Sequence, residues 1–225
     1  MRVLSVAGDL MAFDAYDDYE QGEQVRQWLR ANAASILVGI VLGLLLIFGW
    51  QQWRAHQQRY RMAAAEQYQV LQQALQDKND ALATAATERL MKDYPDTVFA
   101  TFAAAGRAER AATAGQYAQA ATALTWAEQH AGDAALKRLF ELRLAQVELA
   151  QGQPAAALAR LDKLPAGAYA GATQALRGDA LLALKRPAEA RAAYAAALAV
   201  FKPDAPERAL VQLKFDDLAT AGKQG

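Results

Sequence analysis

The sequence predicts an all-α protein with a single N-terminal transmembrane helix followed by a stack of helical hairpins. Three observations lead to this prediction. Much of the hydrophobic fraction, which is 54% of the 225 residues, is alanine, a strong helix former and a poor strand former. One stretch of 23 residues near the N-terminus contains no charged side chain. The rest of the chain repeats a helix–turn–helix pattern with a period of about 34 residues.

Composition excludes several classes of function. The 24 basic and 24 acidic residues give no net charge at pH 7, whereas a nucleic-acid binder needs a basic surface, so no nucleic-acid partner is expected. The absence of cysteine removes disulfides, cysteine-ligated metals, thiol nucleophiles and a lipid-modified N-terminal cysteine. The two histidines, His56 and His130, are far apart in sequence. We therefore predict neither a metal nor a cofactor.

The N-terminal 30 residues are predicted to form an acidic tail. Residues 1–18 show no pattern that predicts a structure, and the first ten differ in character from the rest of the tail, so Met11 is a second candidate start. Residues 19–30 read YEQGEQVRQWLR, which is typical of a short amphipathic helix at the cytoplasmic membrane interface. Three apolar side chains share one face of that helix: Val25, Trp28 and Leu29.

Residues 31–53 are predicted to cross the membrane once. No charge occurs between Arg30 and Arg54, and a bilayer core of about 30 Å needs roughly 20 apolar residues in a helix. Trp50 and Trp53 at the C-terminal end fit the aromatic belt of the interface and are the predicted interfacial anchors. The stretch is longer than the apolar region of a signal peptide, and no A-x-A cleavage site follows it. It is therefore interpreted as an uncleaved signal anchor.

Gly39 and Gly43 form a G-x-x-x-G motif inside this segment. Small residues four positions apart let a second helix approach closely, and close packing drives helix association in lipid. Glycine is also common in membrane helices, so the motif by itself is a weak signal. We predict that the face of Gly39 and Gly43 packs against another membrane helix.

The orientation in the membrane does not follow from the charges. The N-terminal flank contains Arg26 and Arg30, whereas the C-terminal flank contains Arg54, Arg59 and Arg61. The positive-inside rule therefore weakly favours a cytoplasmic C-terminal side. That rule applies to short loops, however, because long domains cross the membrane largely regardless of their charge. On physical grounds both orientations stay open.

Residues 54–222 are predicted to form a repeat domain. LRLAQVELAQGQPAAALARLDKLP, which begins at Leu142, aligns with ALRGDALLALKRPAEARAAYAAAL, which begins at Ala175, at an offset of 33 residues. Two more degenerate copies lie upstream. The four turn centres are 37, 37 and 33 residues apart: Lys78, Gly115, Gly152 and Lys185. A helix–turn–helix unit of about 34 residues is the tetratricopeptide signature, so we predict a degenerate tetratricopeptide solenoid.

The packing residues of the repeats are predicted from the same motif. Small residues let paired helices cross closely, and a large residue fills the space between repeats. The residues that occupy these positions are Gly115, Gly152, Gly178, Leu181, Ala190, Tyr194 and Ala197. Three aromatic residues elsewhere in the domain, Tyr117, Trp126 and Tyr169, are interpreted as packing residues rather than as binding hot spots.

Helices are also predicted at both ends of the repeat domain. No glycine or proline interrupts residues 51–77, so the membrane helix is expected to extend into the first repeat. Residues 204–222 are predicted to form a helix that caps the exposed end of the stack. Its apolar residues are Leu210, Leu213, Phe215 and Leu218.

No motif in the chain indicates catalysis. The phosphate-binding G-x-x-x-x-G-K-[ST], the dinucleotide-binding G-x-G-x-x-G, the zinc-binding H-E-x-x-H and the nucleophile motif G-x-S-x-G are all absent from the sequence. His130 precedes Gly132 and is expected at a helix C-terminus, where its charge complements the helix dipole. We therefore predict that the protein is not an enzyme.

The chain resembles the YfgM-like ancillary subunits of the bacterial Sec translocon. The similarity lies in VGIVLG at 38–43, GWQQWRAHQ at 49–57 and LRGDALL at 176–182, and it extends from about residue 16 to the end of the chain. The resemblance implies an inner-membrane protein with a cytoplasmic N-terminus and a periplasmic repeat domain. It also implies association with the SecYEG channel and with a membrane-anchored periplasmic prolyl-isomerase-like chaperone.

Two hypotheses for the function stay open, with a signal-anchored enzyme as a distant third. The first is a chaperone-like interaction module at the translocon, whose solenoid binds partner proteins or translocated polypeptides. The second is a scaffold of another envelope assembly machine, such as cytochrome maturation or cell division. We favour the first, because repeats form extended binding surfaces and because the resemblance includes the membrane flanks.

Overall fold

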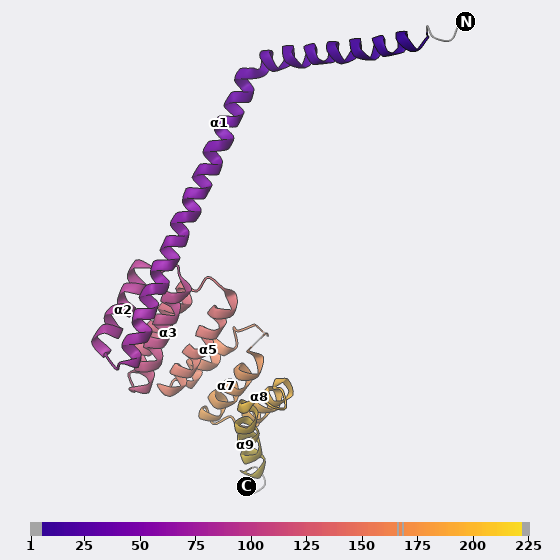
Figure 1. The fold of residues 1–225 in the computed structure, drawn as a ribbon. Coiled ribbons are helices and arrows are strands. Elements are labelled where there is room, and N and C mark those ends of the chain that lie inside the picture. Colours follow the sequence, from indigo (N-terminus) through magenta and orange to yellow (C-terminus); the bar gives the residue numbers. More distant parts are fainter. Residues whose placement is uncertain (1–5, 166, 168, 222–225) are drawn as a thin grey trace. The chain divides into compact units, whose positions relative to one another are not determined.

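The computed structural model describes the backbone of residues 6–165, 167 and 169–221, and, within these ranges, the side chains of residues 26–218. In this part of the chain there are nine helices and no strand, which confirms the predicted all-α class (Figure 1). The chain divides into two compact units, Met1–Arg59 and Tyr60–Gly225.

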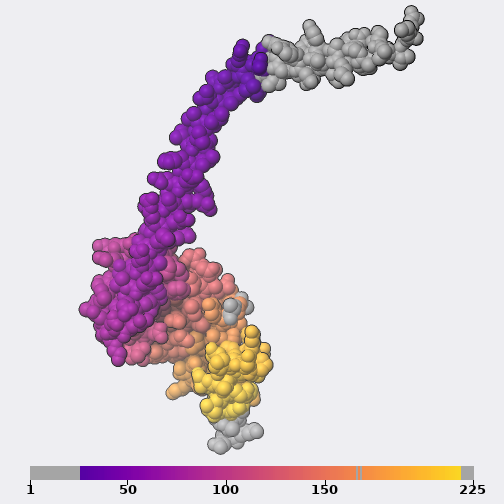
Figure 2. Space-filling model, in the orientation of Figure 1, coloured from indigo at the N-terminus to yellow at the C-terminus, as the bar shows by residue number. Residues whose placement is uncertain are grey.

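The first unit consists of the greater part of helix α1, Val6–Gln76. Within α1 the stretch Arg26–Gln76 is long and apolar enough to cross a membrane. The large apolar side chains at positions 37–53 of this stretch are exposed, with Leu46 75% exposed. Figure 2 shows this part of α1 as a single helix. A helix that is apolar on every side buries these side chains in lipid or in a protein core.

The N-terminal boundary of α1 differs from the sequence-based expectation. No structure was predicted for residues 1–18, yet α1 begins at Val6. The physical reason is that this stretch contains no proline, so nothing stops the backbone hydrogen bonds of the helix from continuing upstream. The predicted short helix over 19–30 is part of the same element. At its other end α1 continues to Gln76 without a break, as the absence of glycine and proline predicts.

The second unit contains the end of α1 and eight further helices, which form successive hairpins side by side (Figure 1). They are α2 (Asp80–Asp93), α3 (Val98–Thr113), α4 (Tyr117–His130), α5 (Ala134–Ala150), α6 (Pro154–Leu161), α7 (Ala170–Ala183), α8 (Pro187–Val200) and α9 (Pro206–Ala221). The hairpins are α3–α4, α5–α6 and α7–α8, preceded by the end of α1 with α2, which share a buried cluster. Each helix from α2 to α8 also packs against the next one along the chain. Pro154 and Pro187 begin α6 and α8, where no backbone hydrogen bond is lost.

The same turn closes all four hairpins, at the four centres that the repeat spacing predicts. Lys78, Gly115, Gly152 and Lys185 adopt left-handed backbone angles, with φ of 54°, 74°, 72° and 59°. The amide after each of them donates to the carbonyl five residues earlier, for example from Gln116 to Ala111 at 2.8 Å and from Arg186 to Leu181 at 2.9 Å. This is the Schellman motif, which satisfies the last carbonyl groups of a helix. Two of the four positions have glycine, the residue that adopts this conformation without strain.

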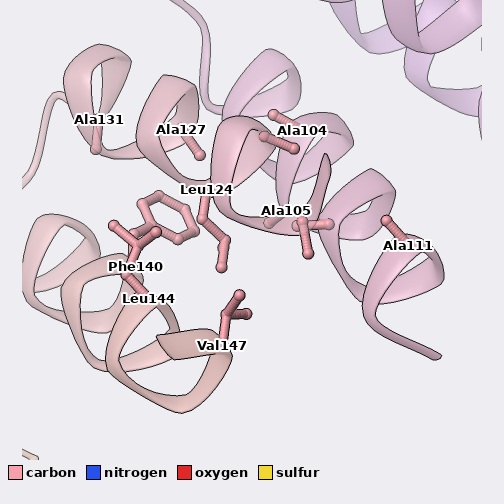
Figure 3. Packing of buried hydrophobic residues seen from close by; sticks show 12 residues of the cluster. Ala104, Ala105, Ala111, Leu124, Ala127, Ala131, Phe140, Leu144 and Val147 are labelled. Atoms are coloured by element: carbon pink, nitrogen blue, oxygen red, sulfur yellow. The ribbon is translucent and has the colours of Figure 1, made fainter. Parts of the chain in front are cut away.

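Alanine dominates the interior of the second unit. In the cluster between α3, α4 and α5, the side chains of all three helices point toward one another, with Phe140 as the largest buried member (Figure 3). A second cluster joins α1, α2 and α3 through residues that include Leu71, Leu90 and Ala103. Because the alanine side chain is a single methyl group, the helix backbones approach one another closely at these contacts.

The last repeat contains a close contact between two helices. Gly178 of α7 faces the ring of Tyr194 of α8, and a Cβ atom at position 178 would overlap Cε1 of that ring. The Tyr194 hydroxyl donates to Oδ1 of Asp179 at 2.7 Å, and Nζ of Lys214 of α9 donates to the same oxygen at 2.6 Å. Burial, followed by the hydrogen bond to Asp179, raises the pKa of Tyr194. One carboxylate thus connects three helices.

The terminal helix α9 covers the stack with only part of its apolar surface. Val211 is buried against α7 and α8, and Phe215 and Leu218 pack beside it. Leu210 and Leu213, which were expected among the residues of the cap, are exposed to solvent. They lie one residue before and two residues after Val211, and such positions point to other sides of a helix.

Replacement of Gly178 by alanine tests the contact with Tyr194. We expect the Gly178→Ala variant to lower the free energy of unfolding by about 2 kcal/mol, because the added methyl overlaps a ring that is fully enclosed. Thermal unfolding of the purified full chain, followed by circular dichroism, measures the effect.

The matched control is Gly106→Ala in α3, where the added Cβ meets only the end of the Arg110 side chain at 3.5 Å. Alanine is the better helix former, so this variant should be as stable as the parent chain or slightly more stable. Equal stability of the two variants would contradict the packing described here.

Candidate interaction groove

A groove of about 490 Å³ lies between the first helices of two neighbouring hairpins, α3 and α5. The helix α4 packs against both of them and forms the floor of the groove through Leu124. The lining is Ala105, Ala108, Glu109, Ala112, Thr113, Tyr117, Leu124, Leu139, Leu142, Arg143, Gln146, Val147 and Ala150.

The small side chains of α3 are what leave the groove open. Ala105, Ala108 and Ala112 line one wall with methyl groups only, and longer side chains at these positions would fill the groove. Opposite them, Leu139 and Val147 of α5 add apolar surface. The groove is therefore apolar in its depth, a property of sites that bury side chains of a ligand.

Polar groups of both signs stand at the mouth of the groove. Glu109 and Gln146 are exposed and Arg143 is half-buried, and all three line the groove. A carboxylate accepts hydrogen bonds, a guanidinium donates them and an amide does both. Together with the apolar floor, these groups suit a polypeptide segment, which offers backbone N–H and C=O groups beside apolar side chains.

An ion pair fixes the helix that forms one wall of the groove. Nε and one terminal nitrogen of Arg160 in α6 donate to Oε1 of Glu148 in α5, at 3.0 and 2.7 Å. The hydrogen bond to Glu148 raises the pKa of Arg160. The side chain of Glu148 is 15% exposed, and its Oε2 atom is buried without a hydrogen-bond partner in the described part of the chain. The pair therefore links the two helices of the third hairpin in a partly dry environment.

A second, smaller hollow of about 360 Å³ lies where the loops α2–α3 and α4–α5 meet. Thr97 and Asp133, which cap the N-termini of α3 and α5, line it together with Asp96 and His130. His130 is the last residue of α4; its ring stacks on Trp126 at 3.9 Å, and its Nδ1 lies 2.9 Å from the Trp126 carbonyl oxygen. Thr97, His130 and Asp133 of this hollow thus lie at helix ends.

The residues singled out from the sequence lie on the exposed surface of α1, in the turns of the hairpins or in the interior of the repeat domain. No atom lies within 4 Å of a Cβ built at Gly39 or Gly43, so their face is open. The rings of Trp50 and Trp53 are exposed and 5.1 Å apart. The repeat positions are either in turns (Gly115 and Gly152) or in the interior (Gly178, Leu181, Ala190, Tyr194 and Ala197).

Sequence reasoning did not single out the polar residues of the groove. Glu109 and Gln146 are 37 positions apart, and so are Thr113 and Ala150, which is the spacing of the two turns at Gly115 and Gly152. Equivalent positions of successive first helices therefore face the same groove. This spacing is the signal that could have found it. Of the three aromatics interpreted as packing residues, Tyr117, Trp126 and Tyr169 all pack against core clusters, and Tyr117 lines the groove as well.

Repeated hairpins with one shared turn define a helical-repeat protein. The chain belongs to the tetratricopeptide repeat-like domain family, whose profile matches residues 26–220. This match confirms the predicted degenerate tetratricopeptide fold.

Three relatives have the same description, ancillary SecYEG translocon subunit. The one from Haemophilus influenzae is 29% identical over 167 residues, which are 73% of this chain and 81% of that protein. The one from Escherichia coli is 29% identical over 181 residues, 80% of this chain and 86% of that protein. The one from Neisseria gonorrhoeae is 29% identical over 192 residues, 85% of this chain and 89% of that protein. The resemblance inferred from the sequence is thereby confirmed.

Removal of the Arg160 guanidinium tests the ion pair beside the groove. We expect Arg160→Met to lower the free energy of unfolding by about 2 kcal/mol, because the Glu148 carboxylate stays partly buried without a donor. The double variant Glu148→Met with Arg160→Met should recover most of this loss. Chemical denaturation followed by circular dichroism measures both.

The exposed pair between Arg186 and Glu189 is the matched control, since it also joins a guanidinium to a carboxylate through two hydrogen bonds, but on the surface. Arg186→Met should leave stability unchanged, because water screens exposed pairs. A loss at Arg186 as large as that at Arg160 would refute the importance of burial.

Proposed function

We propose that the protein is a membrane-anchored interaction subunit, ancillary to the Sec translocon, whose repeat domain binds other proteins. The observation that supports this most directly is the open groove between α3 and α5 in a chain that is similar to three ancillary translocon subunits over most of its length. The proposed role is binding rather than catalysis: chaperone recruitment or the handling of translocated polypeptides.

The proposed organisation has three segments. Residues 1–30 are a cytoplasmic tail, residues 31–53 a single signal anchor in the bacterial inner membrane, and residues 54–222 a periplasmic repeat domain. The extent of the similarity to translocon subunits supports this orientation, and a domain of this length is free to cross regardless of the charge of its flank. The open face of Gly39 and Gly43 is the proposed contact with a membrane helix of the translocon.

The groove is the proposed site of partner binding. An extended segment of a translocated polypeptide, or a segment of a membrane-anchored prolyl-isomerase-like chaperone, would place apolar side chains over Leu124 and Leu139. Its backbone groups would then meet Glu109, Arg143 and Gln146 at the mouth. Because α3 and α5 are held by packed cores, the groove exists before the ligand arrives, which lowers the ordering cost of binding.

Photocrosslinking in membranes tests the partners. A photoreactive side chain at Gln146, which is exposed in the groove, should capture a Sec subunit, the chaperone or a translocated polypeptide, identified by mass spectrometry. The matched control position is Gln119, exposed on α4 and not among the groove residues, where the yield should be at least several-fold lower. Recovery of cell-division or haem-handling proteins without any Sec subunit would favour the scaffold hypothesis instead.

A reporter fused to the C-terminus tests the orientation. A periplasm-dependent reporter, such as a phosphatase that needs oxidised disulfides, should be active there, because the proposed repeat domain lies outside the cytoplasm. A reporter that folds only in the cytoplasm should be inactive at the same position. The opposite pair of results would overturn the proposed topology.

A further inference from the structure

Three side chains form an exposed cluster where the apolar part of α1 ends. The rings of Trp50 and Trp53 lie 5.1 Å apart, and Cζ of Arg54 lies 5.6 Å from the centre of the Trp50 ring. Both tryptophans are more than half exposed. Positions 53 and 54 are three and four residues after position 50, about one helical turn, so both side chains lie near that of residue 50. The guanidinium is therefore placed by a ring rather than by a carboxylate.

The depth of this cluster in a bilayer is set by helix geometry. Residues 31–49 contain no charge, and at about 1.5 Å per residue they span roughly 28 Å, close to the hydrocarbon thickness of about 30 Å. Trp50 then lies at the edge of the hydrocarbon, and Arg54 lies roughly 6 Å further along the helix axis. The headgroup layer on each side is about 5–8 Å thick. Arg54 is therefore at the depth of the phospholipid phosphates.

The charge around the cluster has one sign. No acidic residue occurs between Glu23 and Glu66, whereas Arg54 and Arg59 lie just after the span. In the described part of the chain neither of these two arginines forms an ion pair with a carboxylate. An arginine at this depth without an acidic partner complements an anion, and the anion present in the headgroup layer is phosphate.

We propose that Trp50, Trp53 and Arg54 form a binding site for the headgroup of an anionic phospholipid. The guanidinium stacks on the Trp50 ring and keeps its N–H groups free to form paired hydrogen bonds with phosphate oxygens. The indole N–H groups are further donors at the same level, and their rings remain beside the acyl chains. This inference rests on the membrane span and is independent of the translocon partner and of the groove.

Retention of lipid by the purified full chain tests the site. The protein in mild detergent is offered equal amounts of phosphatidylglycerol and phosphatidylcholine, and the lipids retained are counted by native mass spectrometry. The parent chain should retain phosphatidylglycerol in preference. Arg54→Gln should lower that retention about fivefold, the effect expected of one basic residue near a headgroup layer. Inorganic phosphate at millimolar concentration should not displace the lipid.

Two further variants separate a built site from general charge. Arg107→Gln removes the same charge from an exposed position on α3 and should leave retention unchanged. Trp50→Leu keeps every charge but removes the ring under the guanidinium, and it should lower retention of phosphatidylglycerol by a similar factor to Arg54→Gln. The helical content of each variant, measured by circular dichroism, shows that the chain is still folded.

Several outcomes would overturn the proposal. Equal retention of the two lipids by the parent chain would show no preference for an anionic headgroup. Equal losses in Arg54→Gln and Arg107→Gln would indicate a general charge effect, as would full retention by Trp50→Leu. Displacement of the lipid by inorganic phosphate would indicate a site for the free anion instead.

Discussion

The repeat domain depends on the close approach of neighbouring helices that alanine and glycine permit. Most of the buried hydrophobic residues are alanines, and in the last repeat the Tyr194 ring lies where a Cβ of residue 178 would be. Methyl groups bury little apolar area each, so a few larger side chains, among them Phe140 and Leu90, supply much of the burial energy. Polar contacts such as Asp179 with Tyr194 and Lys214 then fix the order of the helices.

The same choice of residues connects the fold to the proposed binding site. The helices α3 and α5 both pack closely against α4. Because the side chains of α3 that face α5 are mostly alanines, a groove stays open between these two helices above α4. The polar residues at its mouth, Glu109, Arg143 and Gln146, are not part of the buried core, so their side chains are available to the proposed ligand. In the first unit the opposite condition holds, since an apolar helix with every side exposed has no core of its own and is stable only where lipid or another protein surrounds it.

Much of the fold was predictable because it is periodic. The spacing of Lys78, Gly115, Gly152 and Lys185 located all four turns, since a left-handed turn residue ends each first helix. The start of α1 was missed because the prediction relied on an amphipathic pattern, whereas a helix can continue upstream without one where no proline breaks it. The groove was missed for a different reason. Its walls come from different hairpins, and Glu109 and Gln146 look like ordinary surface residues until the repeat places them at equivalent positions.

Hydrogen–deuterium exchange of the full chain in lipid nanodiscs tests the central claim, a lipid-embedded helix joined to stacked hairpins. We expect slow exchange throughout residues 31–49, because lipid shields helical amides that water would reach in an exposed helix. Residues 80–221 should show blocks of slow exchange separated by fast amides at the loops between helices. Fast exchange across residues 31–49 in the nanodisc, or uniformly fast exchange across the repeats, would contradict this account.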